Sequence, residues 1–438
     1  MLESLKARIS PMLSGVIILK YYLWRAKLAA RWYDYPGKKI KVIGVTGTNG
    51  KTTTCALVSS IMELSGSKVA EASTVRFKIG SRVWKNNYKM TTITPWHLQS
   101  FLARAQRAGC EYAVLEITSH SLSQFRVFGI DFFGAVLTNI TRDHLDYHKT
   151  LEDYVAAKMK LFEADPFISV INLDDPSSEN FLQLISSHQI SYSIGSKKAG
   201  VRAEKITYTP NTTDFVLVTP KGQAVIKLAI KGKFNIYNAL AAAAVAYGLE
   251  VSLETIKRGL ESVNLVRGRM EEISQGQPFR VIIDYAHTPD AFEKIYEALR
   301  PIIKGRIIAV FGATGNRDTG KRPMLSAIAS RFADMIILTN EDPYTEDPAE
   351  ILKQVAGGVD SKKFTRGKNY FQIIDRERAI VKACHTAQAG DLVLITGKGH
   401  EEVMAVAHPK NPRLSILAPY NERKVVKRVL AKLKLTAK

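Results

Sequence analysis

The chain has 438 residues and a formal net charge of +21, from 62 lysine and arginine residues against 41 aspartate and glutamate residues. This length exceeds one typical core and indicates two or three domains, while a hydrophobic content of 46% and a mean hydropathy of −0.07 describe a soluble globular protein. The cysteines Cys55, Cys110 and Cys384 are widely spaced, which argues against a disulfide framework or a zinc site and favours the reducing cytoplasm.

The positive charge is compatible with nucleic acid, an anionic membrane surface or a polyanionic small substrate as partner. The basic residues are scattered along the chain rather than gathered in blocks, and the sequence contains no nucleic-acid-binding motif. We therefore expect nucleotides and anionic substrates as partners, and no nucleic acid.

An apolar stretch from Met12 to Trp24, interrupted by Lys20, dominates the N-terminal segment of residues 1–38. The stretch is shorter than the about 20 apolar residues that span a bilayer, and no small-residue cleavage site marks a signal peptide. Two interpretations stay open. The segment is either a helix packed on the protein body or an interfacial helix, which would make residues 1–36 a peripheral contact with a membrane or another protein.

The stretch from Lys41 to Thr54, KVIGVTGTNGKTTT, joins an apolar run to a glycine-rich turn and the start of a helix. Such a loop directs backbone N–H groups at a polyphosphate, with Lys51 on the β- and γ-phosphates and the Thr52 hydroxyl on Mg²⁺. Val45 stands where the usual P-loop spacing has glycine, but the order of strand, turn and helix favours a nucleotide-binding loop over an ordinary turn. The residues expected to bind phosphate are Gly47, Thr48, Asn49, Gly50, Lys51, Thr52 and Thr53.

Residues 39–264 are predicted to form an α/β domain with a mostly parallel sheet, because apolar strands recur at KVIGVTG, YAVLEITS, FGAVLTNI and SVINLDD. The segment from Val201 to Lys231 alternates polar and apolar residues around turn signals, which predicts an antiparallel meander at the edge of the sheet. A helix is expected from Asn238 to Tyr247, and another that ends at about Val263.

Residues 265–438 contain a second set of apolar strands, RVIIDYAH, RIIAVFGATG, MIILTNEDP and DLVLITGKGH. Each of these strands ends in polar or glycine-rich residues. The pattern predicts a second doubly wound, Rossmann-like domain whose functional residues lie at the carboxyl edge of the sheet.

Polar residues also follow the strands of the first domain. Glu116 and the group Thr118–His120 follow one strand, and Asn139 to His144 follow the next. Glu116 and His144 are candidate Mg²⁺ contacts, because magnesium prefers oxygen ligands beside phosphates and only occasionally takes nitrogen. Several such residues at consecutive strand ends favour a functional site over isolated caps. Lys158 lies in the helical stretch YVAAKMKLF, where an exposed lysine is the default expectation.

The run EITSHSLSQFRVFGIDFFGAVLTNITRDHLDYHKTLEDYVAAKMKLF resembles the Mur ligases, in particular the UDP-N-acetylmuramoyl-tripeptide synthetases. The similarity continues in order through GKFNIYNALAA, VRGRMEEI, VIIDYAHTPDAF, VFGATGNRDTGKRP, TNEDPYTEDP and GKGHEE, from about residue 40 to the C-terminus. The resemblance implies that ATP phosphorylates a substrate carboxylate and that the amine of an amino acid attacks the resulting acyl phosphate to give an amide.

The resemblance also implies a set of catalytic and metal-binding residues. Lys51 and Thr52 match the groups that handle phosphate and a first Mg²⁺ ion, with Glu116 on the same ion, and His144 matches a ligand of a second Mg²⁺ ion. Lys158 matches the lysine that the family carbamylates, a reaction with CO₂ that turns the ammonium group into an anion able to hold a metal.

Further matches concern ATP and the muramoyl-peptide substrate. The residues matched to the adenine side are Asn235 and Asn238, and those matched to the nucleotide-facing side of the C-terminal domain are Arg269, Asp284, His287, Asn316, Arg317, Lys321 and Arg322. The residues matched to substrate-gripping positions are Thr92, Thr94, Thr118, Gln124 and Arg126. Thr118 stands where serine is usual, and Ile93 replaces an expected threonine.

Two departures from the family pattern concern the substrates. The family normally carries a longer N-terminal stretch that holds the uridine diphosphate, so we expect the acceptor's nucleotide end to be held by another protein, or the acceptor to differ. Members that add meso-diaminopimelate carry Asp-Asn-Pro-Arg, whose arginine pairs with the distal carboxylate, whereas this chain has Glu341-Asp342-Pro343-Tyr344. A tyrosine cannot form that bidentate ion pair.

The resemblance places five residues around the far end of the incoming side chain: Glu341, Asp342, Tyr344, Gly397 and Glu401. Three carboxylates and no arginine would make this end negative, which favours lysine or ornithine over diaminopimelate. Arg322, or another cation folded into the pocket, would reverse that preference.

The sequence therefore predicts a cytoplasmic ATP-dependent ligase that adds an amino acid to a UDP-muramoyl-peptide-like carboxylate in peptidoglycan precursor synthesis. One alternative is a related ligase that acts on another acid, of the folylpolyglutamate or pseudomurein type. The other is a non-catalytic ATP-binding subunit, against which the intact Lys51, Glu116, His144 and Lys158 argue.

Overall fold

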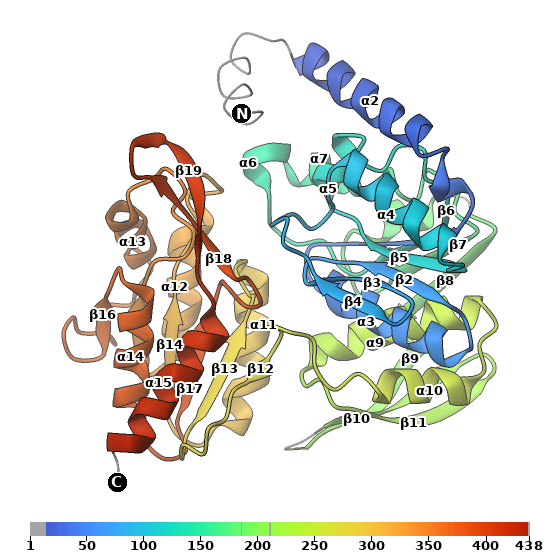
Figure 1. Ribbon diagram of the computed structural model, residues 1–438. Coiled ribbons are helices and arrows are strands. Elements are labelled where there is room, and N and C mark those ends of the chain that lie inside the picture. The colour runs from blue at the N-terminus through green and yellow to red at the C-terminus, as the bar shows by residue number, and fades with distance from the viewer. Residues whose placement is uncertain (1–14, 185, 210–211, 437–438) are drawn as a thin grey trace. The chain divides into compact units, whose positions relative to one another are not determined.

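A computed structural model describes residues 15–184, 186–209 and 212–436 of the protein (Figure 1). The chain divides into two compact units. The first runs up to Thr141 and continues from His148 to Asn264, and the second consists of Arg142–Tyr147 together with the chain from Leu265 onwards. The short helix α6 (Leu145–His148) spans one of these boundaries, because its last residue, His148, belongs to the first unit and the residues before it belong to the second.

The first unit is built on a sheet that has, among the described residues, eleven strands in the order β11-β10-β9-β8-β7-β6-β1-β5-β2-β3-β4. The strands are β1 (Lys41–Thr46), β2 (Val69–Ala72), β3 (Arg76–Ile79), β4 (Arg82–Lys85), β5 (Tyr112–Glu116), β6 (Phe132–Leu137), β7 (Ile168–Asn172), β8 (His188–Ser193), β9 (Val201–Tyr208), β10 (Thr213–Thr219) and β11 (Gly222–Leu228). The four apolar strands expected from the sequence, β1, β5, β6 and β7, are neighbours and pair in parallel. The antiparallel meander is confirmed as β9 to β11 at one edge.

Helices cover both faces of this sheet. Successive side chains of the central strand β1 point to opposite sides and are apolar on both, so each face needs a covering layer. Val42 packs in one core with Leu102, and Ile43 packs in the other with Leu57. The helices of the unit are α2 (Gly15–Trp32), η1 (Pro36–Lys38), α3 (Lys51–Leu64), α4 (Pro95–Arg107), α5 (Ser119–Ser123), α7 (Leu151–Met159), α8 (Ser178–Leu182), α9 (Lys233–Gly248) and α10 (Leu253–Glu261). None of these described helices is long and apolar enough to cross a membrane.

The alanine-rich helix α9 begins at Lys233, five residues before the expected start at Asn238, because Gly232 with φ +105° ends the preceding loop. Its alanines between residues 239 and 246 are buried. Their small side chains let α9 pack closely beside α3, which follows the glycine-rich loop.

The second unit contains a sheet in the order β12-β13-β17-β14-β15-β16 within the described residues, parallel except for β12. Its strands are β12 (Glu271–Glu272), β13 (Arg280–Asp284), β14 (Ile307–Phe311), β15 (Met335–Leu338), β16 (Tyr370–Gln372) and β17 (Leu392–Thr396), and a separate hairpin joins β18 (Val403–His408) to β19 (Asn411–Pro419). Its helices are α11 (Pro289–Leu299), η2 (Arg300–Ile302), α12 (Lys321–Phe332), α13 (Pro348–Ala356), α14 (Arg376–Thr386) and α15 (Glu422–Thr436). The predicted doubly wound domain is therefore confirmed.

Strand order decides which loops can form a site. In the first unit β5, β1 and β6 are adjacent and parallel, so the loops after Glu116, Thr46 and Leu137 emerge side by side. In the second unit the neighbours β13, β17, β14 and β15 bring their carboxyl ends together in the same way. Functional groups in doubly wound folds gather at such edges.

Candidate functional site

The loop between β1 and α3 requires glycine at two positions. Gly47 has φ +145°, and a Cβ there would lie 1.9 Å from the Thr138 hydroxyl oxygen. Gly50 caps α3 with φ +86°, and a Cβ there would lie 2.2 Å from Asn238 Oδ1. Both contacts are far closer than atoms tolerate, so the loop depends on residues without side chains.

The loop after β6 holds this glycine-rich loop in shape. Asn139 Oδ1 accepts the Asn49 N–H at 3.0 Å, and its amide nitrogen donates to the Asn49 carbonyl at 3.0 Å. The Thr48 N–H donates to the Asn139 carbonyl at 2.7 Å, and the Thr138 hydroxyl donates to the Asn49 carbonyl at 2.7 Å. Helix α3 begins directly after, so its N-terminal N–H groups and the positive end of its dipole adjoin the loop.

Two lysine amino groups converge on the carbonyl of Gly47. Lys51 Nζ donates to it at 3.0 Å and to the Thr48 carbonyl at 2.8 Å, and Lys158 Nζ donates to Gly47 at 2.9 Å. Lys158 is buried, with Nζ 4.4 Å from the centre of the Tyr154 ring. The default expectation of an exposed Lys158 is therefore wrong, because its amino group is buried against the backbone of the loop.

Glu116, at the end of β5, provides a carboxylate that contacts the first turn of α3. Its Oε2 accepts the Thr52 hydroxyl at 3.0 Å, together with the N–H and the hydroxyl of Thr74 at 2.8 and 2.9 Å. The described residues contain no group of three His, Cys, Asp or Glu side chains that could hold a metal. A Mg²⁺ ion needs only one or two protein oxygens when phosphates and water supply the rest, and the buried Thr52–Glu116 pair has that chemistry.

Four of the substrate residues expected in the first unit form one network beside Glu116. The Thr92 hydroxyl donates to the Glu116 carbonyl at 2.9 Å and accepts the Thr118 N–H at 3.0 Å. Arg126 donates to the Thr92 carbonyl at 2.9 Å and to Gln124 Oε1 at 3.0 Å. The arginine is thus held in place by groups that adjoin the candidate magnesium site.

The remaining substrate residue, Thr94, lies apart from this network at the N-terminus of α4, where its hydroxyl contacts His97 Nδ1 at 2.8 Å. Sequence reasoning missed Thr74, which donates twice to Glu116, and the buried His148, whose Nε2 lies 2.9 Å from the Ser119 hydroxyl. The signal for His148 was present in the DHLDYH motif, but only its first histidine was assigned a role.

The two asparagines matched to the adenine side lie one turn apart on α9. Asn238 Nδ2 donates to Asn235 Oδ1 at 2.9 Å, and Asn235 Nδ2 donates to the Lys231 carbonyl at 2.7 Å. Both are buried, as is Thr53 in the first turn of α3. Asn238 is also the residue that a side chain at position 50 would strike.

His144 belongs to the segment Arg142–Tyr147, which groups with the second unit. The residue has φ +55°, and its Nε2 lies 3.3 Å from Asp143 Oδ2. Lys321 Nζ lies 3.9 Å from the same carboxylate. Burial and the charge of Lys321 lower the pKa of His287 to about 4, so His287 is neutral at pH 7.

The other residues of the second unit that match the nucleotide-facing side of the family contact mostly other groups of the protein. Asp284 accepts the N–H groups of Met270 and Ala286, both at 2.7 Å, and burial raises its pKa despite the nearby Arg269. Arg322 is fully buried and pairs with Glu346 at 2.8 Å. The remaining contacts are Arg269 over the Tyr285 ring, Arg317 over the Tyr344 ring and Asn316 Nδ2 to the Thr345 hydroxyl.

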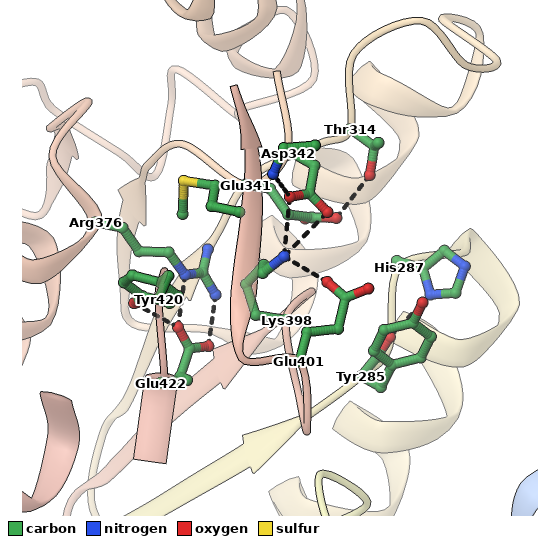
Figure 2. Close-up of polar contacts among 12 residues, drawn as sticks. Tyr285, His287, Thr314, Glu341, Asp342, Arg376, Lys398, Glu401, Tyr420 and Glu422 are labelled. Atoms are coloured by element: carbon green, nitrogen blue, oxygen red, sulfur yellow. Dashed lines mark hydrogen bonds and ion pairs between the residues drawn. The ribbon is translucent and has the colours of Figure 1, made fainter. Parts of the chain in front are cut away.

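A buried lysine occupies the centre of the acidic group expected around the incoming side chain (Figure 2). Lys398 Nζ donates to both Asp342 oxygens, at 2.9 and 3.0 Å, and forms a second ion pair with Glu401. Burial alone would lower the pKa of Lys398, but the two carboxylates outweigh it and raise the pKa. Lys398 is thus a cation inside the expected acidic group, which remains net negative but less so than the count of its carboxylates alone suggests.

Glu341 differs from the other two carboxylates of this group. Its Oε1 accepts the Thr314 hydroxyl at 2.8 Å, and its Oε2 lies so close to Gly397 that a Cβ there would be 2.3 Å away. Burial raises the pKa of Glu341, an effect that the nearby Arg376 partly offsets. Arg376 itself forms a buried ion pair with Glu422 at 2.7 Å.

Tyr344 occupies the position of the arginine in the Asp-Asn-Pro-Arg pattern, and Arg317 lies beside it. The Arg317 guanidinium lies 5.5 Å from the centre of the Tyr344 ring. Tyr344 has φ +53°, and its N–H donates to the Ala405 carbonyl at 3.0 Å, which fixes the backbone at this point. The far end of the group thus contains cations as well as carboxylates.

Comparisons with known proteins cover most of the chain. Residues 45–246 match the Mur ligase middle domain, and residues 268–399 match the Mur ligase, glutamate ligase domain. A UDP-N-acetylmuramyl-tripeptide synthetase of Roseiflexus sp. (strain RS-1) is 43% identical over 424 residues, covering 93% of this chain and 82% of that protein. A UDP-N-acetylmuramoyl-L-alanyl-D-glutamate–2,6-diaminopimelate ligase of Bacillus licheniformis is 41% identical over 384 residues, covering 86% and 77%. A solved structure of a ligase with that same description has a TM-score of 0.61 at 31% identity, covering 90% of this chain and 79% of its own.

Gly50→Ala is expected to weaken ATP binding about tenfold or more, because the new methyl group must displace Asn238 at the base of the loop. Gly66→Ala is the matched control, since Gly66 has φ +95° but no atom within 4 Å of a new Cβ. Both variants carry the about 1–2 kcal/mol cost of a left-handed alanine, so their difference isolates the clash. Titration calorimetry with ATP measures it, and equal affinities for the two variants would contradict the assignment.

Lys398→Met is expected to destabilise the second unit by roughly 3–5 kcal/mol, because the buried Asp342 and the partly buried Glu401 both lose their cation. The triple variant Lys398→Met/Asp342→Asn/Glu401→Gln should lose less, since no buried charge remains unpaired. Lys353→Met, on a side chain that is 79% exposed, should change stability by less than about 1 kcal/mol. Denaturant unfolding measures the free energy of unfolding of each variant. If the triple variant is as unstable as Lys398→Met, the loss comes from packing and not from unpaired charge.

Proposed function

The chain belongs to the Mur ligase family, and on this premise we propose that it joins an amino acid to the carboxylate of a UDP-muramoyl-peptide-like substrate in peptidoglycan precursor synthesis. The observation that carries the proposal is the glycine-rich loop of the first unit, where Lys51 and the Thr52–Glu116 pair lie at the start of α3. The three cysteines are free and buried, which suits work in a reducing cytoplasm.

The reaction has two steps whose atoms balance. An oxygen of the substrate carboxylate attacks the γ-phosphorus of ATP, and ADP leaves as an acyl phosphate forms. The amine of the amino acid then attacks the acyl carbon, loses a proton and displaces inorganic phosphate, which leaves an amide. Both steps demand alignment of reactants and neutralisation of phosphate charge more than they demand covalent help from the protein.

The residues of the first unit are suited to these demands. Lys51 and the N-terminus of α3 balance phosphate charge, and the Thr52 hydroxyl with the Glu116 carboxylate would hold a Mg²⁺ ion, which supplies further neutralisation. Arg126, held by Thr92 and Gln124, is placed to bind an anionic group of the acceptor.

A second Mg²⁺ ion and a carbamylated Lys158 form the finer part of the proposal. Lys158 is buried beside the loop, where an ammonium group would repel a metal and a carbamate would attract one. His144 supplies a nitrogen that Mg²⁺ occasionally accepts. The support for these two roles is the match of both residues to the family's motif.

Lys158→Ala is expected to reduce ligation to near background, because the buried position loses the group that becomes the carbamate. Raised bicarbonate should not restore activity, whereas small added carboxylates should restore part of it. Lys160→Ala, an exposed lysine at the end of the same helix, should retain wild-type activity. Phosphate release in the presence of both substrates is the measurement, and wild-type rates in Lys158→Ala would remove this lysine from the mechanism.

We propose that the incoming amino acid carries a distal amino group. Glu341 supports this, because it is the carboxylate of the acidic group that is not bonded to Lys398 and so remains suited to a substrate ammonium. Arg317 beside Tyr344 supplies a cation for a distal carboxylate. Lys398 offsets one of the three negative charges, and together with Arg317 beside Tyr344 it weakens the basis for excluding diaminopimelate.

The test of the function is a ligation assay with ATP and UDP-muramoyl-dipeptide and equimolar lysine, ornithine and meso-diaminopimelate, with products read by mass spectrometry. We expect an amide product and stoichiometric ADP, with diaminopimelate incorporated alongside lysine. Tyr344→Arg should raise the share of diaminopimelate, because a second guanidinium can pair with its distal carboxylate. Absence of product with every amino acid would contradict the proposed function, and lysine as the only amino acid incorporated would contradict the role given to Arg317.

A further inference from the structure

Helix α2 presents an apolar stripe to solvent. Its residues recur at intervals of three and four, which places them on one side of the helix. The α2 stripe consists of Ile17, Tyr21, Trp24, Leu28 and Trp32, all of them exposed, with Trp24 at 58% and Trp32 at 75%. Residues 1–14, which include the start of the apolar stretch noted in the sequence, lie outside the described residues.

The opposite side of α2 is anchored on the first unit. Ala26, Ala29 and Ala30 are buried, and Ala30 lies against Gly129, where an added Cβ would be 2.9 Å from the Ala30 methyl group. The C-terminal half of α2 packs beside α4, while its N-terminal half extends away from that helix (Figure 1). The anchoring fixes the stripe on the outer side.

The charges of α2 have one sign. The helix contains four basic residues and no aspartate or glutamate between Gly15 and Trp32. At 100° per residue, Lys20, Lys27 and Arg31 line one edge of the stripe and Arg25 lies near the other. Long basic side chains beside an apolar face can extend towards anionic groups while their methylene stems lie on the apolar surface.

We propose that the α2 stripe docks the protein on the surface of an anionic lipid bilayer, with the helix lying in the plane of the interface. The apolar and aromatic side chains enter the boundary between headgroups and acyl chains, where Trp and Tyr are favoured, and the flanking cations meet lipid phosphates. Within the described residues, α2 is not long and apolar enough to cross a membrane. This docking surface is independent of the ligase reaction.

Charge complementarity distinguishes a bilayer from the other candidate occupants. A second copy of the chain packed stripe to stripe would bring four cations against four, with no carboxylate on either helix. Nucleic acid would satisfy the cations but would leave the apolar stripe in water. An anionic bilayer satisfies both features at once.

The test is sedimentation of the full-length protein with vesicles of phosphatidylcholine alone or with 30% phosphatidylglycerol, a composition of about one anionic lipid in three. We expect binding to the anionic vesicles that weakens with salt. Trp24→Ser/Leu28→Ser should weaken it roughly thirtyfold through lost apolar contact. Lys20→Gln/Lys27→Gln/Arg31→Gln should weaken it about a hundredfold, since each cation near such a surface contributes about fivefold.

Matched controls carry the same changes elsewhere on the surface. Val83→Ser/Val225→Ser removes two apolar residues of similar exposure, and Lys353→Gln/Lys362→Gln/Lys368→Gln removes three exposed cations. Both controls should bind vesicles as the wild type does, and all four variants should keep full ligase activity on soluble substrates.

Three results would overturn the proposal. One is wild-type vesicle binding by the two α2 variants, and another is an equal loss in the controls. The third is a dimer of the lipid-free wild type that Trp24→Ser/Leu28→Ser converts to monomer, since a second copy would then cover the stripe. Ligase activity measured on the same samples separates these results from a failure of the proposed function.

Discussion

The geometry of the first unit depends on the contact between the glycine-rich loop and the loop that follows β6. The side chains of Thr138 and Asn139 bond to the backbone of Asn49, and Gly47 leaves no room between itself and Thr138. This contact exists because β1 and β6 pair in parallel, so that their loops leave the sheet at the same edge. On the other side of the loop, Asn238 closes against Gly50, which ties the alanine-rich helix to the same point.

The second unit contains buried cations that are paired with carboxylates. Lys398 and Arg376 each occupy the interior with carboxylate partners, Asp342 and Glu401 for the first and Glu422 for the second. Removing ions from water costs several kcal/mol each, so these positions are tolerable only because the partners are in direct contact. The result is a rigid polar framework around Glu341, whose carboxylate reaches the backbone at Gly397.

The central strands of both sheets could be predicted because buried parallel strands are continuous apolar runs. The hairpin of β3 and β4 was missed, since Arg76–Ile79 and Arg82–Lys85 each have only four residues, two of them charged, and lie at the edge of the sheet. The glycine-rich loop between β1 and α3 could be predicted from its glycines and Lys51, whose spacing is local. The burial of Lys158 could not be predicted, because its neighbours in the sequence do not show which other elements of the fold cover its side chain.

The same limit explains the acidic group of the second unit. The sequence shows Glu341, Asp342 and Glu401 as three negative charges, and Lys398 as one residue of a glycine-rich turn. Their compensation arises only when β15 and β17 bring the two loops to one edge of the sheet. A count of charges in a motif therefore overstates the field that a ligand meets.

The Gly47 carbonyl, which receives the amino groups of both Lys51 and Lys158, has a consequence for how anions enter the loop. The carbonyl oxygen places a partial negative charge against both amino groups. A phosphate contacted by Lys51 would have to compete with the Gly47 and Thr48 carbonyls for the ammonium protons, so its binding would be an exchange of acceptors rather than the filling of an empty field.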